Sequence, residues 1–184
     1  MKEDTRFEIR LAGAGGQGLI LAGIILAEAA IYDDKNATHT QSYGPEARGG
    51  ASRSEVIVAD GDIDYPKVTQ ADLMLCMSQE SCDKYFYDVK KGGILIVDAG
   101  LVDHVPTSKA YKVDLTELAR GVTGRAITAN VVALGLIVGL TGIVSHQAIK
   151  AAVAARAPRG TTELNLKALA AGLEEAKRLK GQRE

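Results

Sequence analysis

The chain has 184 residues, of which 46% are hydrophobic and 24% charged, and its formal net charge is −1. This is the length of one ordinary domain that can bury a core of its own, so we expect a single domain over residues 1–184. A net charge so close to zero argues against nucleic acid or an anionic membrane surface as the partner.

The amino-terminal segment is charged and lacks the long apolar stretch of a signal peptide. The longest apolar stretch, around residues 131–138, is too short to cross a membrane. The two cysteines, Cys76 and Cys82, are separated by five residues, a spacing that matches neither a disulfide framework nor a CxxC motif. We therefore expect free thiols in a reducing compartment and a cytoplasmic protein.

The first predicted elements are a strand over residues 7–12, a glycine turn over 13–18 and an apolar helix over 19–32. Residues 44–54 hold too much glycine, proline and charge for regular structure and predict a loop. Further strands are predicted at residues 38–43, 54–59, 72–77 and 93–98.

The second half of the sequence is mainly helical in pattern. A helix over 79–91 separates two of the strands, and a short edge strand is expected at 112–113. Helices are then predicted over residues 115–120, 128–140, 145–156 with Ser145 as its cap, and 161–179. This order predicts an α/β fold with a doubly wound, mostly parallel sheet, helices on both faces and a helical carboxyl-terminal region.

The glycine turn is the first candidate site. Its sequence, GAGGQG, follows a strand and opens a helix, where backbone N–H groups and the helix dipole can hold an anion. Leu19 stands where a phosphate-binding loop has lysine, and the strand predicted at 38–43 has no acidic residue for a ribose. A structural turn, NAD or FAD binding, a partner's cofactor and a substrate phosphate all stay open. The candidate residues are Gly13, Gly15, Gly16, Gln17 and Gly18.

A polar loop with the sequence QSYGPEARGGAS is the second candidate site. Two consecutive glycines allow another surface to come close to the backbone, and an arginine offers a planar, bidentate guanidinium. A loop so dense in specific polar groups is typical of a binding site, although an ordinary surface loop remains an alternative. Its candidate residues are Ser42, Tyr43, Gly44, Glu46, Arg48, Gly49 and Gly50.

Asn130 is the remaining candidate, because it lies in a strongly apolar helix and predicts either a polar contact at the helix start or an interface group. The three histidines have no metal-ligand spacing. No serine among Ser52, Ser54 and Ser78 has a neighbouring base in the sequence, so we assign none of them a catalytic role.

Five motifs together make the chain resemble the gamma subunits of 2-oxoacid:ferredoxin oxidoreductases. They are GAGGQG, SYGPEARGGAS, DLML from Asp72, KGGILI from Lys91 and ANVVALG from Ala129, in the order and spacing associated with that family. The form of the second loop is more similar to the 2-oxoglutarate enzymes than to the pyruvate enzymes. The beta subunit of indolepyruvate oxidoreductase is similar as well and stays an alternative.

The resemblance implies a subunit of an enzyme that oxidatively decarboxylates a 2-oxoacid with thiamine diphosphate, passes electrons through iron–sulfur clusters to ferredoxin and transfers the acyl group to coenzyme A. Two cysteines cannot hold a [4Fe–4S] cluster alone, and the thiamine-site motif is missing, so we expect no cofactor bound by this chain alone.

The implied partners are the alpha and beta subunits and a small ferredoxin-like delta subunit, with ferredoxin reached through the complex. We expect the two loops to face the alpha and beta subunits and to help form the coenzyme A side of the active site. A freestanding nucleotide-binding module and a purely structural assembly subunit remain as alternatives.

Overall fold

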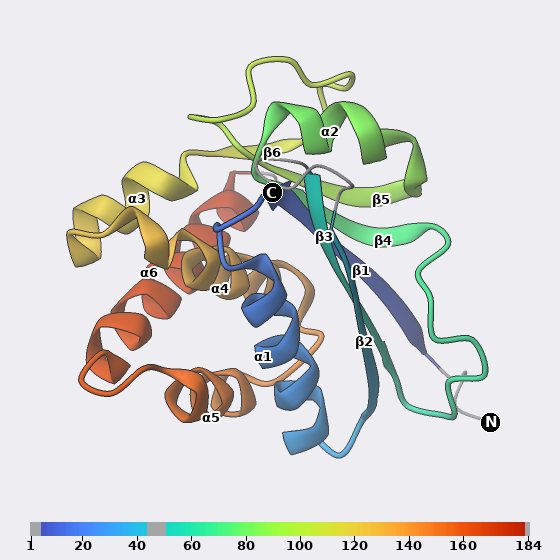
Figure 1. The fold of residues 1–184 in the computed structure, drawn as a ribbon, viewed down its shortest axis with the longest axis horizontal. Helices are drawn as coiled ribbons and strands as arrows, with labels where there is room; N and C mark the ends of the chain where they lie inside the picture. The colour runs from blue at the N-terminus through green and yellow to red at the C-terminus, as the bar shows by residue number, and fades with distance from the viewer. Residues whose placement is uncertain (1–4, 44–50, 183–184) are drawn as a thin grey trace.

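The computed structural model describes residues 5–43 and 51–182. A six-stranded sheet in the order β2-β3-β1-β4-β5-β6 forms its centre (Figure 1). β1, β4, β5 and β6 run parallel, whereas β3 is antiparallel to both of its neighbours. The strands are β1 (Arg6–Ala14), β2 (Asn36–Ser42), β3 (Ala51–Ala59), β4 (Ala71–Cys76), β5 (Val89–Asp98) and β6 (Tyr111–Val113).

Helices cover both faces of the sheet unequally. Most of them lie on one face, while α2 lies on the other (Figure 1). The helices are α1 (Leu19–Tyr32), α2 (Gln79–Tyr85), α3 (Leu115–Thr123), α4 (Ala129–Thr141), α5 (His146–Arg156) and α6 (Thr162–Gly181), with the short 3-10 helices η1 (Phe86–Asp88) and η2 (Ala126–Thr128). The predicted α/β fold, with helices on both faces and a helical carboxyl-terminal region, is confirmed.

The strands supply two separate apolar layers because successive side chains point to opposite faces. On β4, Leu73 and Leu75 join the larger core under α1 and α3–α6. Met74 and Cys76 alternate with them and join the smaller core under α2. A strand buried on both faces reads as a continuous apolar run, which is why residues 72–77 were recognisable as a strand.

Close contact between α4 and α6 anchors the helical region. Almost all of α4 is buried, including Gly135. A β-carbon on Gly135 would lie 2.2 Å from the carbonyl oxygen of Leu169, and one on Gly172 would lie 2.0 Å from that of Val132. Glycine is required at these two positions because the helix backbones themselves are in contact.

A buried ion pair between Arg10 and Glu55 links β1 to β3 on the face of the sheet that α2 covers. The guanidinium of Arg10, 2% exposed, lies 2.7 Å from a carboxylate oxygen of Glu55. It also bonds to Asp88 and donates to the carbonyl oxygen of Val68 at 3.2 Å. Because each of these bonds compensates for lost hydration, the charge is tolerated inside the fold.

Two local predictions were wrong. The helix predicted over 79–91 ends at Tyr85, and Val89–Lys91 begin β5 instead. The loop predicted over 44–54 is too long, because residues 51–54 pair with β1 as part of β3. The sheet is mostly parallel, as predicted, but it is not wholly so, since β3 lies between β1 and β2 and runs against both.

No single helix in the described ranges is long and apolar enough to cross a membrane. The segments 115–123 and 126–141 meet the length and composition criteria only as a pair, and that pair is bent by 119°. Most residues of α4 are buried within the protein core.

Candidate functional site

The glycine turn lies at the edge of the sheet where the parallel strands end. β1 stops at Ala14 and α1 begins at Leu19, so four residues join them. Gly16 and Gly18 have φ values of +89° and +74°, which L side chains rarely adopt. Gly15 and Gly16 are exposed, and Gly13 is buried. The predicted tight turn between strand and helix is confirmed.

Gln17 ties the turn to the neighbouring strand. Its Oε1 atom accepts a hydrogen bond from the Ala14 amide at 2.8 Å, and its Nε2 group donates to the Met77 carbonyl oxygen at 2.7 Å. Met77 directly follows β4, and its own amide donates to the Ala12 carbonyl oxygen at 2.8 Å. The side-chain amide of Gln17 therefore fixes the turn against β4, and both its oxygen and its nitrogen are hydrogen-bonded within the protein.

Asn130 joins the start of α4 to the start of α1. Its Nδ2 group donates to the Gly18 carbonyl oxygen at 3.1 Å, and its Oδ1 atom accepts from the Val131 amide at 2.9 Å. The residue is buried, and a β-carbon on Gly18 would lie 2.5 Å from its Nδ2 atom. Of the two interpretations from the sequence, the structure therefore supports a polar contact at the helix start.

A hollow of about 220 Å³ opens beside the turn. Its walls come from the turn, from the residues after β4 and β5, and from the starts of α3 and α4. They are Gly16, Gln17, Met77, Leu101, Thr116, Ala126, Ile127 and Ala129. In α/β sheets, ligands bind outside the carboxyl ends of the strands, which is where this hollow lies.

The local electrostatics favour an anion at this edge. Neither α1 nor α4 has an acidic residue in its first turn, and no side chain caps either amino terminus. The first N–H groups of a helix lack partners within it and carry its positive dipole end. The start of α1 after Gly18 can therefore receive a phosphate or carboxylate. At the start of α4, the Ala129 amide donates to the Ala126 carbonyl oxygen and the Val131 amide donates to Asn130 Oδ1.

The second candidate loop ends beside this turn and begins at the end of β2, on the far side of β3. Pairing of β1 with β3 sets Gly13 opposite Ser52, whose hydroxyl donates to the Gly13 carbonyl oxygen at 3.2 Å. At the other end, Ser42 closes β2 opposite Arg53, and Tyr43 is 66% exposed. The remaining predicted residues, Gly44, Glu46, Arg48, Gly49 and Gly50, lie outside the described residues.

The family model for pyruvate ferredoxin/flavodoxin oxidoreductase matches residues 8–175. The match takes in the glycine turn, the second loop and Asn130. The chain belongs to this oxidoreductase family. The family predicted from the five motifs is thereby confirmed.

Relatives within the oxidoreductase family match the chain nearly end to end. The 2-oxoglutarate synthase subunit KorC of Methanocaldococcus jannaschii is 50% identical, over 95% of this chain and 96% of that protein. KorC of Methanothermobacter thermautotrophicus is 46% identical, over 93% and 95%. The ketoisovalerate oxidoreductase subunit VorA of the latter organism is 34% identical over 95% of this chain, but the match spans only 37% of VorA.

Solved structures show the same fold. The gamma subunit of a keto/oxoacid ferredoxin oxidoreductase from Geobacter sulfurreducens has a TM-score of 0.87 and is 51% identical, covering 95% of this chain and 98% of that one. The 2-oxoglutarate:ferredoxin oxidoreductase of Magnetococcus marinus, solved with 2-oxoglutarate, coenzyme A and succinyl-CoA, has a TM-score of 0.85. At 22% identity over 96% of this chain and 32% of that one, this second likeness concerns the fold alone.

The sheet order of this family member argues against a dinucleotide-binding module. In a Rossmann fold the second strand neighbours the first and presents the acidic residue that binds the ribose. Here β3 separates β2 from β1. The end of β2 therefore lies two strands away from the glycine turn.

Two exposed residues that line the hollow were missed from the sequence. Leu101 and Ile127 are exposed apolar residues in short connecting segments, which leave no periodic pattern. Asp98, which was also missed, does not line the hollow but bonds to Thr116, which does. It is fully buried at the end of β5 and accepts hydrogen bonds from Gly100 N and from Thr116 N and Oγ1. Burial raises the pKa of Asp98. The one sequence signal that could have identified Asp98 was the presence of an acidic residue at the end of a buried strand.

The two cysteines lie together in the smaller core, although they are on β4 and α2. Contact with the Cys82 thiol and burial raise the pKa of Cys76, whereas contact with Cys76 lowers that of Cys82. Among the described residues, no group of three or more His, Cys, Asp or Glu side chains could hold a metal ion. The thiols therefore do not fit an iron–sulfur cluster.

The serines have structural partners. Ser78 caps α2 by accepting from the Ser81 amide, and Ser54 is fully buried with its Oγ atom 2.9 Å from Nε2 of His39. Sequence reasoning missed that His39 neighbour because β2 and β3 bring the two residues together. Since the Ser54 hydroxyl lies away from any surface, the pair does not make a nucleophile.

Proposed function

We propose that this chain is the gamma subunit of a 2-oxoglutarate:ferredoxin oxidoreductase. The observation that carries the proposal is the pair of matches at 50% and 51% identity, each covering 95% of this chain and at least 96% of the relative. Identity to pyruvate synthase subunits is lower, at 32% for PorC of Methanocaldococcus jannaschii. That gradient favours 2-oxoglutarate over pyruvate as the substrate of the complex.

The chemistry of such a complex divides between chains. Thiamine diphosphate supplies the carbanion chemistry and iron–sulfur clusters carry the electrons, and the residues of this chain suit neither group. We therefore assign both to alpha, beta and small ferredoxin-like delta partners, with ferredoxin as the acceptor. A cytoplasmic location stays a prediction from the sequence, to be tested by cell fractionation.

This chain would supply part of the coenzyme A side of the active site. The start of α1 and the amides of the glycine turn offer donors to an anionic group of coenzyme A, such as a phosphate. Gln17 and Asn130 fix the positions of those donors through their bonds to Met77 and Gly18. Binding to donors that are already in place costs little ordering entropy.

Reconstitution tests the proposal. Co-expression with the alpha, beta and delta chains should give a complex that reduces an artificial acceptor only when 2-oxoglutarate and coenzyme A are both present. Pyruvate, 2-oxoisovalerate and indolepyruvate should react more slowly, and omitting this chain should abolish the reaction. Preference for indolepyruvate would instead support the alternative beta-subunit assignment, and tight dinucleotide binding by the isolated chain would support a nucleotide-binding module.

A further inference from the structure

A strip of exposed apolar side chains runs beside the glycine turn. Leu21, Leu101 and Ile127 are 38%, 41% and 58% exposed. Leu21 and Ile127 line one hollow of about 190 Å³, and Ile127 and Leu101 line the hollow beside the turn. We call these three residues the Ile127 strip. Adjacent exposed apolar residues that border hollows are typical of an interaction surface.

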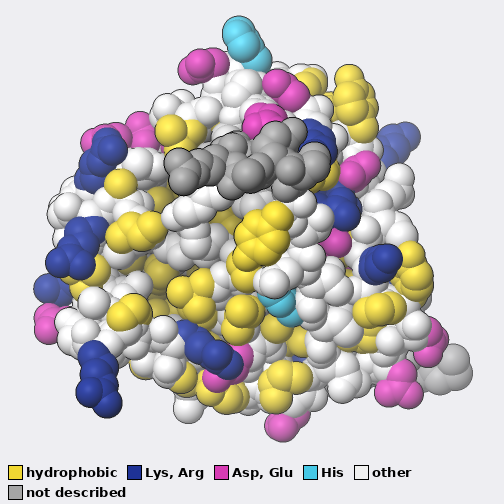
Figure 2. Space-filling view, viewed as in Figure 1, with side chains coloured by type: hydrophobic (Ala, Val, Ile, Leu, Met, Phe, Trp, Pro, Cys, Tyr) yellow, Lys and Arg dark blue, Asp and Glu magenta, His cyan; other side chains and the backbone are white. Residues whose placement is uncertain are grey.

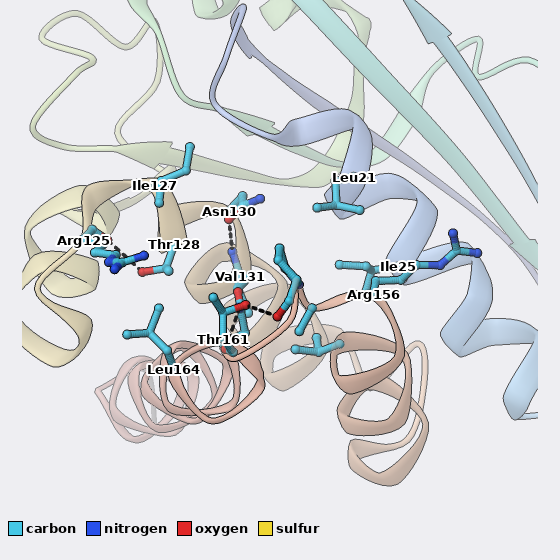
Figure 3. Close-up of a pocket in the computed structure, with 14 residues that line it drawn as sticks. Leu21, Ile25, Arg125, Ile127, Thr128, Asn130, Val131, Arg156, Thr161 and Leu164 are labelled. Atoms are coloured by element: carbon cyan, nitrogen blue, oxygen red, sulfur yellow. Dashed lines mark hydrogen bonds between the residues drawn. The ribbon is translucent and has the colours of Figure 1, made fainter.

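The first of these hollows is built from four helices and is mainly apolar. Leu21 and Ile25 come from α1, Val131 from α4 and Leu164 from α6 (Figure 3). Val153 of α5 also lines this hollow. Figure 2 shows apolar side chains gathered on this face over α1 and beside it. Apolar pockets of this kind receive the anchor side chains that dominate binding energy at protein interfaces.

Charge adds a requirement on the occupant. Arg125 and Arg156 lie at opposite ends of the hollow (Figure 3). Arg156 is neutralised by Glu28 at 2.6 Å, whereas no ion pair is formed by the side chain of Arg125 with any residue in the described ranges. A partner segment that fits this surface therefore carries an apolar anchor with a carboxylate nearby.

The longer relatives indicate what the occupant is. Matches to the VorA proteins cover 95% and 98% of this chain but only 37% and 39% of VorA. In the VorA proteins, the region that matches this chain is therefore part of a longer polypeptide, most of which has no counterpart in this chain. A unit fused to a neighbour in its relatives is expected to meet a different polypeptide here rather than a second copy of itself.

We propose that the Ile127 strip docks the partner subunit that corresponds to the additional sequence of VorA, through an apolar side chain seated between Leu21 and Ile127 and a carboxylate facing Arg125. The inference rests on the proposed function, since it needs a heteromeric complex. It goes further by assigning the contact surface and the chemistry of the partner segment.

The test compares charge-introducing variants on two faces. Ile127→Glu should weaken association of the purified chain with the co-expressed partner subunits by about tenfold or more. Arg125→Glu should weaken it as well and make it less sensitive to salt. Tyr87→Glu is the matched control, because Tyr87 is 82% exposed in η1, away from the strip. Unchanged melting temperatures establish that each variant is folded.

The outcomes separate the two proposals. If the wild-type chain binds the partners and Ile127→Glu binds them equally well, the docking surface is wrong while the proposed function stands. If the wild-type chain binds no thiamine-containing partner, the proposed function itself fails. If the wild-type chain forms a dimer that Ile127→Glu dissociates, the occupant is a second copy, and the proposal of a different subunit is overturned.

Discussion

Gly16 and Gly18 share a positive φ but have different surroundings. A β-carbon on Gly16 would meet nothing within 4 Å, whereas one on Gly18 would meet the Asn130 amide. Gly16→Ala should therefore lower the free energy of unfolding by about 1 kcal/mol from backbone strain alone. Gly18→Ala should cost more, about 2–3 kcal/mol, because the Asn130 side chain must also move. Urea unfolding of both variants measures the difference.

A double variant provides the control. Adding Asn130→Ala to Gly18→Ala removes the obstructing amide, so the two changes together should cost less than the sum of their separate effects. Strict additivity would mean that the Asn130 side chain does not press against Gly18, and the described contact would be wrong.

His39 predicts a pH dependence of stability. Burial lowers the pKa of His39, so the folded protein binds this proton less readily than the unfolded chain does. The contribution of neutral His39 to the free energy of unfolding is fully present above the pKa of histidine in the unfolded chain, about 6.5. It is lost as the pH falls from there toward the lowered pKa of the folded protein. Between pH 7.5 and 5.5 the wild type should lose more unfolding free energy than His39→Gln does. Equal losses in denaturant titrations at both pH values would contradict this.

The residues of the turn could be predicted, but their partners could not. The spacing of the glycines and their place between a strand and a helix identified the segment 13–18 as a candidate site. The contacts of Gln17 with Met77 and of Asn130 with Gly18 join positions 60 and 112 residues apart. Such contacts depend on which strands and helices become neighbours, and local sequence patterns do not contain that information.

At the level of elements, the α4–α6 contact gives a sharp prediction. Gly172→Ala should destabilise the protein by about 1–3 kcal/mol, because its β-carbon would press on the Val132 carbonyl group. Gly121→Ala is the matched control, since Gly121 lies in α3 with open space around it. Removing a helical glycine there should stabilise by about 0.5–1 kcal/mol. Thermal unfolding that showed the same sign for both would contradict the described contact.

Helices and strands were predicted correctly where the spacing of apolar residues was clear. The helix over 19–32 was placed to the residue, and Ser145 caps α5 by accepting from the Ala148 amide. The prediction failed at residues 86–91, where charged residues follow a helix and pairing with β4 turns Val89 into strand. The ion pair of Lys90 with Asp72, at 2.9 Å, also belongs to that pairing. Tertiary contacts overrode local helix preference there.

At the scale of the whole molecule, sequence order predicted the layers but not the sheet order. Alternation of strands and helices implied a covered sheet, and the larger and smaller cores on its two faces agree. The antiparallel β3 between β1 and β2 was not foreseen, because a return strand has the same local pattern as a parallel one. That return strand is also what brings the end of the second loop beside the glycine turn.

The complex as a whole is the setting for a prediction on the second loop. Arg48 lies outside the described residues, but its place between glycines in the sequence predicts a recognition role. Arg48→Ala should lower the turnover or coenzyme A affinity of the reconstituted complex by the equivalent of about 1.5–3 kcal/mol. The melting temperature of the isolated chain should stay nearly unchanged. If the variant complex keeps its full turnover and coenzyme A affinity, Arg48 has no recognition role and is an ordinary surface charge.

The bond from the Ala14 amide to Gln17 also supplies a natural spectroscopic probe. An amide held by an internal acceptor exchanges its hydrogen slowly with deuterated solvent, and it exchanges faster whenever the local structure opens. The Ala14 signal in a nuclear magnetic resonance spectrum therefore records how often the turn opens in the free protein. Gln17 also lines the hollow. Slower exchange of the Ala14 amide on adding coenzyme A or a partner chain would therefore report that the molecule binds beside the turn and reduces its opening.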